Sequence, residues 1–140
     1  MRLLCLYYVC NENRVLYRYN LNTEEHTVIF EPNNIDEGVH WFATYKDMLF
    51  VGMSGILYKT NQDGSEKTIF AEMQDNVYNG FGFAAISNDQ VYYFRDNAVY
   101  RQAINQGDEI KVCDAKSGKS NFGYAKVNYG INDSGLYFTN

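Results

Sequence analysis

Short runs of alternating hydrophobic and polar residues follow one another along most of the chain, which is the period-two pattern of half-buried β-strands. The clearest example is the stretch 57–70, LYKTNQDGSEKTIF, in which two such runs flank Asp63 and Gly64. An Asp-Gly pair in this setting predicts a β-hairpin, because glycine tolerates the positive φ of a tight turn. Similar stretches lie at 16–30 and 99–113. The hairpin is therefore one copy of a repeated unit.

The repeated unit has a period of 41 or 42 residues. Tyr17, Tyr58 and Tyr100 lie 41 and then 42 positions apart in equivalent hairpins. A column of alanines keeps nearly the same spacing: Ala43, Ala84 and Ala125. Repeats of about 40–45 residues with four strands each are typical of β-propeller blades. The sequence therefore predicts an all-β repeat protein made of propeller blades.

If the strands of one blade are called a, b, c and d, the chain holds strands b to d of a first blade, two complete blades, and strands a and b of a fourth. These parts occupy 1–32, 39–73, 80–114 and 122–140 of a single repeat domain that spans 1–140. The predicted strands are 3–9, 15–19 and 27–30; 40–45, 48–53, 56–60 and 67–71; 81–86, 90–95, 98–103 and 109–113; 123–128 and 135–139. The sequence thus predicts a partial or half propeller without a helix.

Each of the three repeated tyrosines is expected to bury its ring between neighbouring blades, where its hydroxyl can also find a polar partner. A basic residue follows each tyrosine and points to the other side of the strand. We expect its apolar stem to lie along the next blade and its charge to reach solvent. The basic residues are Arg18, Lys59 and Arg101.

About three and a quarter four-stranded blades cannot close a ring of ordinary propeller size. An open stack exposes an aromatic blade face at each end. We therefore expect self-association through the open blade ends, or completion of the ring within a longer chain. A β-trefoil is the alternative fold, because it also has three four-stranded repeats of this size and is monomeric at this length. The surplus thirteenth strand favours the propeller.

The composition fits a folded, strand-rich domain, with 46% hydrophobic residues, 16% aromatic residues and one proline. A net charge of −5 without a basic cluster argues against a nucleic-acid partner. No apolar run approaches the roughly 20 residues of a membrane span, so no membrane insertion is expected. No signal-peptide pattern is visible, and the location stays open. An extracellular location would follow if the chain were cut from a longer exported protein.

The cysteines, Cys5, Cys10 and Cys113, are expected to be free thiols, because they lack the paired Cys/His spacing of a metal site. We predict neither a metal site nor a cofactor. Motifs such as the P-loop, GxSxG and HExxH do not occur in the chain. The sequence therefore predicts a protein that is not an enzyme.

Two segments carry a resemblance to a known family: LYKTNQDGS at 57–65 and YFTN at 137–140. The first is similar to an IYRxNxDGS hairpin and the second to a YWTD tetrapeptide. Through them the chain resembles the bacterial β-propeller domains related to the YWTD propeller of the low-density-lipoprotein receptor, which are largely of unknown function. The resemblance implies a propeller fold and leaves the activity open, because a fold does not determine a function.

In a propeller, the d–a and b–c connections share one face, which is usually the ligand face. His40 and Trp41 lie at a loop–strand junction on it and suggest a stacking platform for a sugar or peptide. The structural alternative is that Trp41 fills a gap between blades and His40 caps the strand. The candidate ligand-binding residues are Asn34, Asp36, His40, Trp41, Asp75 and Tyr78.

These observations together predict a non-catalytic β-propeller module that binds a protein or carbohydrate. Two alternatives stay open. A propeller-type hydrolase or lyase would need several polar side chains in the axial channel, whereas the predicted a strands offer mostly small and aromatic residues. A lectin-like β-trefoil would need a repeated sugar-contacting aromatic, whereas Trp41 is the single tryptophan.

Overall fold

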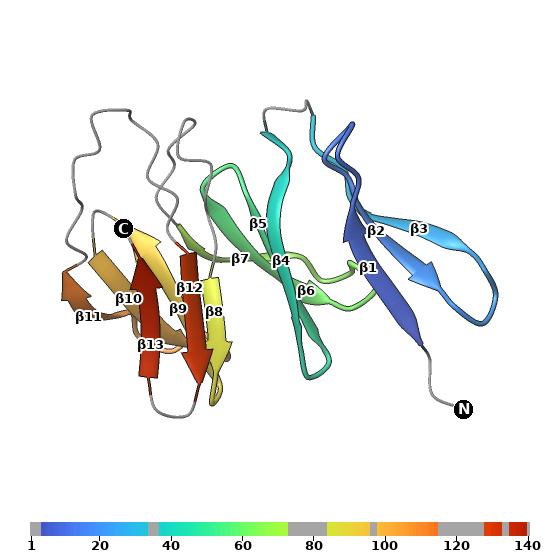
Figure 1. Cartoon of the computed structure of the whole chain (residues 1–140). Helices are drawn as coiled ribbons and strands as arrows, with labels where there is room; N and C mark the ends of the chain where they lie inside the picture. Colours follow the sequence, from blue (N-terminus) through green and yellow to red (C-terminus); the bar gives the residue numbers. More distant parts are fainter. Residues whose placement is uncertain are drawn as a thin grey trace.

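The computed structural model describes residues 4–33, 37–72, 84–95, 98–114, 128–132 and 135–139. These residues form thirteen strands in four antiparallel sheets and contain no α-helix (Figure 1). The first sheet comprises β1 (Cys5–Val9), β2 (Leu16–Asn20) and β3 (His26–Phe30). The second comprises β4 (Val39–Tyr45), β5 (Met48–Met53), β6 (Ile56–Asn61) and β7 (Thr68–Glu72). The third comprises β8 (Ala84–Ser87), β9 (Gln90–Arg95), β10 (Ala98–Ala103) and β11 (Ile110–Asp114), and the fourth β12 (Asn128–Asn132) and β13 (Gly135–Thr139).

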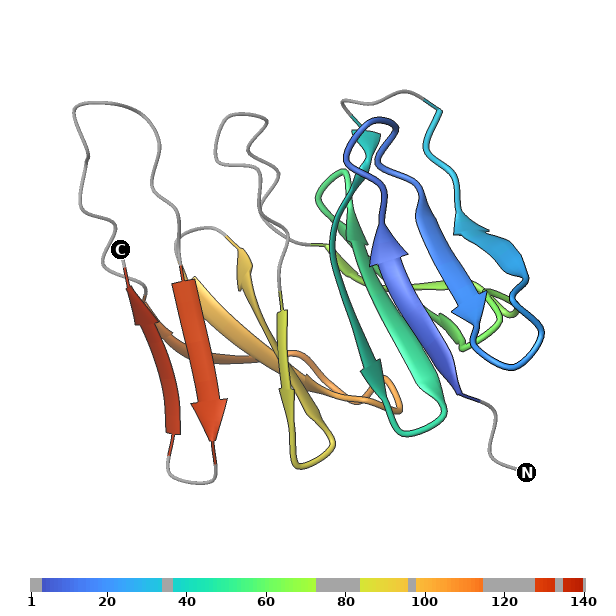
Figure 2. The same ribbon diagram turned by 45° about the vertical axis from the view of Figure 1, so that its right-hand side comes forward.

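Each sheet is a meander in which strands that follow one another in the chain lie side by side. The sheets themselves follow one another in chain order in a row, with β1 and β13 in sheets at opposite ends (Figure 2). The predicted grouping of three, four, four and two strands is therefore confirmed. In the described part of the chain, no helix is long and apolar enough to cross a membrane.

One predicted strand is misplaced. The sequence analysis placed a strand at 123–128, whereas β12 is Asn128–Asn132 and pairs with β13 up to Asn132 opposite Gly135. The described a–b pairs have the same geometry, because strand a ends three residues before strand b begins. The alanine column kept a 41-residue period, while the last b strand lies 45 residues after its predecessor. The extra residues precede the hairpin, so the expected position was too early.

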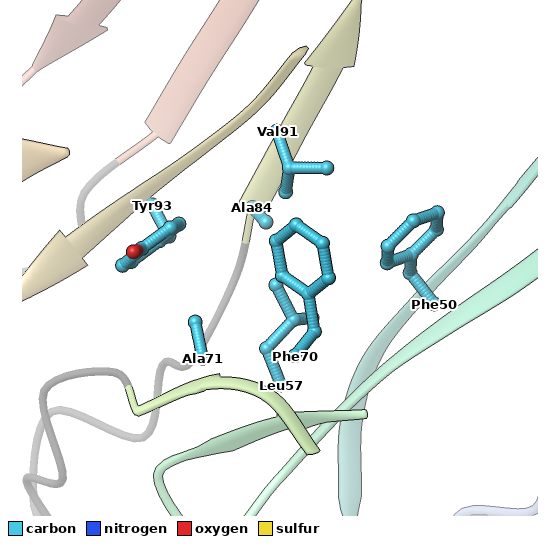
Figure 3. Packing of buried hydrophobic residues seen from close by; sticks show 7 residues of the cluster. All are labelled: Phe50, Leu57, Phe70, Ala71, Ala84, Val91 and Tyr93. Carbon is cyan, nitrogen blue, oxygen red and sulfur yellow. The ribbon is translucent and has the colours of Figure 1, made fainter. Parts of the chain in front are cut away.

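Two hydrophobic cores lie between the sheets. The first intersheet core joins the first and second sheets and contains Leu16, Phe30, Val39, Leu49 and Val51. The second intersheet core joins the second and third sheets and contains Phe50, Leu57, Phe70, Ala71, Ala84, Val91 and Tyr93 (Figure 3). Neighbours on a strand point to opposite faces, so the second sheet contributes alternate residues to the two cores. The sheets are thus held together face to face, as propeller blades are.

The repeated tyrosines of the second and third sheets occupy equivalent places. The Tyr58 ring lies 5.5 Å from the Phe30 ring of the preceding sheet and packs against the first intersheet core. The Tyr100 ring packs against the second intersheet core, 6.2 Å from Tyr93. The expectation that these rings lie between blades is therefore confirmed for both.

The Lys59 ammonium group contacts the third sheet instead of reaching solvent. Its Nζ donates a hydrogen bond of 2.7 Å to the main-chain carbonyl oxygen of Ile104, in the β10–β11 hairpin of the next sheet. The ammonium group was expected in solvent, but a half-buried carbonyl within reach provides a better partner because a charged donor strengthens the bond. The lysine therefore links the second sheet to the third.

We expect Lys59→Met to lower the free energy of unfolding by about 1–2 kcal/mol, because the Ile104 carbonyl loses its charged donor while the apolar stem is kept. Urea denaturation followed by circular dichroism measures the change. Lys111→Met is the matched control, since Lys111 pairs with Asp114 at the surface, and such pairs contribute little. Equal losses in the two variants would show that the Lys59 bond does not stabilise the intersheet contact.

Candidate functional site

The b–c turns and the segments that enter the a strands lie together at one end of the first two sheets. The Val39 amide donates to the Arg14 carbonyl at 3.1 Å, which joins the entry of β4 to the β1–β2 turn. The Ser54 hydroxyl in the β5–β6 turn donates to the Glu37 carbonyl at 3.3 Å. We call this end the loop face and define it by residues 11–14, 31–33, 37–40 and 54–55. It corresponds to the ligand face expected from the sequence.

His40 stands on the loop face because β4 contains a β-bulge. Val39 pairs with Met53 and Trp41 pairs with Gly52, so His40 is the extra residue. In a regular strand, Val39 and Trp41 would point to the same side. With the bulge, Val39 packs in the first intersheet core and Trp41 against the second. His40 between them is exposed, and a bulge is a common way to redirect a side chain next to a binding site.

The Trp41 ring is half-buried against the second intersheet core. This is the structural alternative given in the sequence analysis, in which the ring fills a gap between blades. Ligand binding by Trp41 or His40 stays a prediction. The other candidate residues, Asn34, Asp36, Asp75 and Tyr78, lie outside the described residues.

The candidate ligand-binding residues named from the sequence include none of the glutamates that lie at this end of the sheets. Four exposed glutamates occupy turn or strand-end positions there: Glu12, Glu31, Glu37 and Glu72. Arg14 is half-buried in the β1–β2 turn and has a φ of 58°. A signal for these residues existed, because each glutamate lies within three residues of a predicted strand. An acidic surface of this kind favours partners that carry positive charge.

A second polar cluster lies within the third sheet, where it joins β9 to the β10–β11 hairpin. The Tyr93 hydroxyl and both terminal nitrogens of Arg95 bind the Glu109 carboxylate. The Arg95 guanidinium also lies 4.5 Å from the centre of the Tyr100 ring. Burial raises the pKa of the Tyr93 hydroxyl, and Glu109 raises it further, so Tyr93 stays a hydrogen-bond donor at neutral pH. This cluster fixes β9, β10 and the start of β11 to one another.

Among the described residues, no set of three His, Cys, Asp or Glu side chains is arranged to hold a metal ion. The cysteines Cys5, Cys10 and Cys113 are free thiols.

Four-stranded antiparallel meanders that pack face to face in a row are the blades of a β-propeller, and the chain is accordingly an open, partial β-propeller. Its structure is similar to Kluyveromyces lactis Hsv2 with the complete loop 6CD, with a TM-score of 0.62 at 11% identity over 98% of this chain and 41% of that one. Hsv2 is a seven-bladed propeller.

Two further solved structures are similar to the chain. KlHsv2 with loop 6CD replaced by a Gly-Ser linker has a TM-score of 0.54 at 11% identity, over 77% of this chain and 34% of that one. The computationally designed Ika8 protein has a TM-score of 0.57 at 10% identity, over 99% of this chain and 40% of that one. No protein-family model and no curated protein matches the sequence.

At such identities, these similarities show the fold alone. The chain spans between 34% and 41% of the length of these proteins. The propeller prediction is confirmed, and the β-trefoil alternative has no support from the sheets or from the neighbours.

Proposed function

We propose that the chain is a non-catalytic β-propeller module that binds a partner through the loop face, with a ring completed by further blades. The observation that carries the proposal is the bulge in β4, which exposes His40 beside the β1–β2 turn. Scaffolds of rigid strands commonly carry binding residues on such connections. The finer resemblance to YWTD-related propellers is part of the proposal and rests on the segments 57–65 and 137–140.

A protein segment that carries lysine or arginine is the partner class that the loop face supports best. The exposed glutamates at this end complement positive charge. A carbohydrate partner is the second candidate, because His40 could bond a sugar hydroxyl. A sugar platform would also require an aromatic face, and Trp41 already packs half-buried against the second intersheet core.

The proposal includes no catalytic role, because the described polar side chains that contact one another closely have a structural role. Tyr93, Arg95 and Glu109 bind one another across the third sheet. General acid–base catalysis needs such groups to converge on a substrate site. These three groups hold β9 and the β10–β11 hairpin together.

Peptide and glycan arrays probed with the purified chain test the proposal. We expect binding to Lys- and Arg-rich peptides that weakens as salt is raised, because exposed charges are screened. His40→Ala and Glu37→Gln should each weaken it several-fold. Thr44→Ala, an exposed position at the other end of β4, is the control and should leave binding unchanged.

Three outcomes of these arrays would contradict the assignment. Binding to glycans alone, lost in Trp41→Ala, would replace the peptide partner with a carbohydrate. Equal losses in His40→Ala and Thr44→Ala would remove the loop face as the binding surface. Absence of binding on both arrays, at concentrations up to the solubility limit, would overturn the proposal.

A further inference from the structure

The first sheet has three strands, whereas the second and third sheets have four. In those two sheets, a strand a borders the sheet, because β4 pairs with β5 and β8 pairs with β9. β1 is the strand b of the first sheet and pairs with β2 on one side (Figure 1). No strand in the described part of the chain pairs with its other side. An unpaired strand edge of this kind is a template for an added strand.

Alternate residues of β1 direct their main-chain groups to this open edge. The Cys10 amide, next to the end of β1, donates to the Val15 carbonyl at 3.0 Å. In an antiparallel pair, the residues that exchange main-chain bonds alternate along the strand. The even-numbered residues of β1 therefore bond β2, whereas Cys5, Tyr7 and Val9 present their N–H and C=O groups to the other side. The open edge thus offers alternating donors and acceptors to an extended segment.

The described a–b pairs follow one rule of residue size. A small residue of strand a lies opposite an aromatic residue of strand b in all three pairs: Ala43 opposite Phe50, Ala85 opposite Tyr92, and Gly130 opposite Tyr137. The next residue of strand a is β-branched and lies opposite an aliphatic residue: Thr44 opposite Leu49, Ile86 opposite Val91, and Ile131 opposite Leu136. Residues directly opposite each other in a sheet are in contact, so a large ring favours a small neighbour.

β1 carries the same two residue types at the same register. The basic residue after each repeated tyrosine lies opposite Tyr7, Phe50 and Tyr92, so Tyr7 holds the aromatic position of β1. Its ring packs against the first intersheet core, and its hydroxyl donates to the Gln62 carbonyl at 2.7 Å. Leu6 holds the aliphatic position and is 53% exposed. An added antiparallel strand should therefore place alanine or glycine opposite Tyr7 and a β-branched residue opposite Leu6.

The open edge of β1 continues into the loop face. Strand a enters a sheet from this end, because Val39 at the start of β4 pairs with Met53 at the end of β5. In the first sheet, the corresponding entry lies beside the β1–β2 turn, which belongs to the loop face and carries the exposed Glu12. Residues that precede an added strand would therefore lie beside carboxylates, which favour positive charge.

We propose that the open edge of β1 binds an extended segment of the Lys- or Arg-bearing partner as an antiparallel strand. This segment carries alanine or glycine followed by a β-branched residue, and its basic residues precede both. The proposal rests on the partner class in the proposed function and names the sequence that this partner carries. Strands added to a sheet edge gain affinity from main-chain bonds and specificity from alternate side chains. Further blades would pack against sheet faces, so ring completion and this contact are compatible.

Isothermal titration calorimetry with the synthetic peptide KKKSVHWFATY tests the site, since this peptide carries the sequence of β4 after its lysines. We expect binding that weakens about tenfold when the peptide alanine is N-methylated, because its bond to the Tyr7 carbonyl is lost. N-methylation of the adjacent threonine is the matched control and should leave binding unchanged, because that N–H points away from β1. Replacement of the peptide alanine by tryptophan should weaken binding about tenfold, because the two rings would overlap.

Cys5→Pro removes a main-chain donor from the open edge and should weaken binding several-fold. Proline is tolerated on an unpaired edge, and circular dichroism verifies that the variant is folded. Equal binding of a peptide with the β4 sequence reversed would overturn the proposal, because no register would then be read. Absence of binding by KKKSVHWFATY would also overturn it and would assign strand a to the polypeptide that carries the further blades.

The variant Glu37→Gln separates a failure at the edge from a failure at the loop face. Binding of Lys-rich peptides that is weakened in Glu37→Gln and insensitive to N-methylation would keep the loop face and overturn the edge site. Binding that is sensitive to N-methylation and unchanged in Glu37→Gln would support the edge site and remove the loop face as the source of affinity.

Discussion

Phe50→Ala is expected to lower the free energy of unfolding by about 3–5 kcal/mol, the range for deleting a buried aromatic ring from a core. Phe50 is fully buried and meets Phe70 edge to face, with ring centres 5.4 Å apart at 87°. The ring lies among side chains of the second and third sheets (Figure 3). Its loss therefore removes packing on both sides of the second intersheet core.

Urea denaturation of Phe50→Ala, followed by circular dichroism, gives the change in unfolding free energy. Ile69→Ala is the matched control, because Ile69 is 56% exposed and surface truncations of this kind change stability by about 0.5 kcal/mol or less. If the two variants lost similar stability, the second intersheet core would not hold the sheets together, and the blades would be independent units.

Gly64→Ala should lower the free energy of unfolding by about 1–3 kcal/mol. Gly64 has a φ of +85°, a conformation that residues with a Cβ adopt at a cost. The added Cβ would also lie 3.2 Å from the Ile29 carbonyl oxygen of the preceding sheet. Backbone strain and a close contact between sheets act together at this position.

Gly107→Ala provides the comparison in the next hairpin. A Cβ on Gly107 would meet its nearest neighbour, the Ala103 Cβ, at an ordinary 3.5 Å. This variant should be neutral or gain a few tenths of a kcal/mol, because alanine restricts the unfolded chain. Equal losses in both variants, measured by the same urea titration, would show that the tight approach of Gly64 to Ile29 does not limit the hairpin.

The strands were predictable because alternate residues of a strand point to opposite faces, and the sequence alternates between polar and apolar residues with the same period. Alternation with a period of two gives β5, β9, β10 and β13 at their observed bounds. Ser54-Gly55 and Asn88-Asp89 adopt positive φ at both turn positions, as two-residue hairpins require. The misplaced β12 shows the limit of the rule, because its expected position followed the alanine column, and the extra residues before the last hairpin shift the strand along the chain.

The candidate site was less predictable, because it depends on contacts between sheets. The bulge at His40 can be recognised only once Val39 and Trp41 are known to pack against different cores. The bond from Lys59 to Ile104 joins residues 45 positions apart, and no local pattern indicates it. The glutamates at this end of the sheets were predictable, because charged residues in the turns next to predicted strands are visible in the sequence.

The strand β5 contributes Leu49 and Val51 to one core and Phe50 to the other. A slip of its pairing by a single residue would exchange the contents of both cores at once, so misaligned pairings of the second sheet are heavily penalised. β1 is held in register on one face alone, since Tyr7 and Val9 pack against the first intersheet core while Leu6 and Tyr8 face outward. Errors of strand alignment during folding should therefore concentrate in the first sheet. A neighbour that buries the outward face of β1 would favour the correct pairing of β1 with β2.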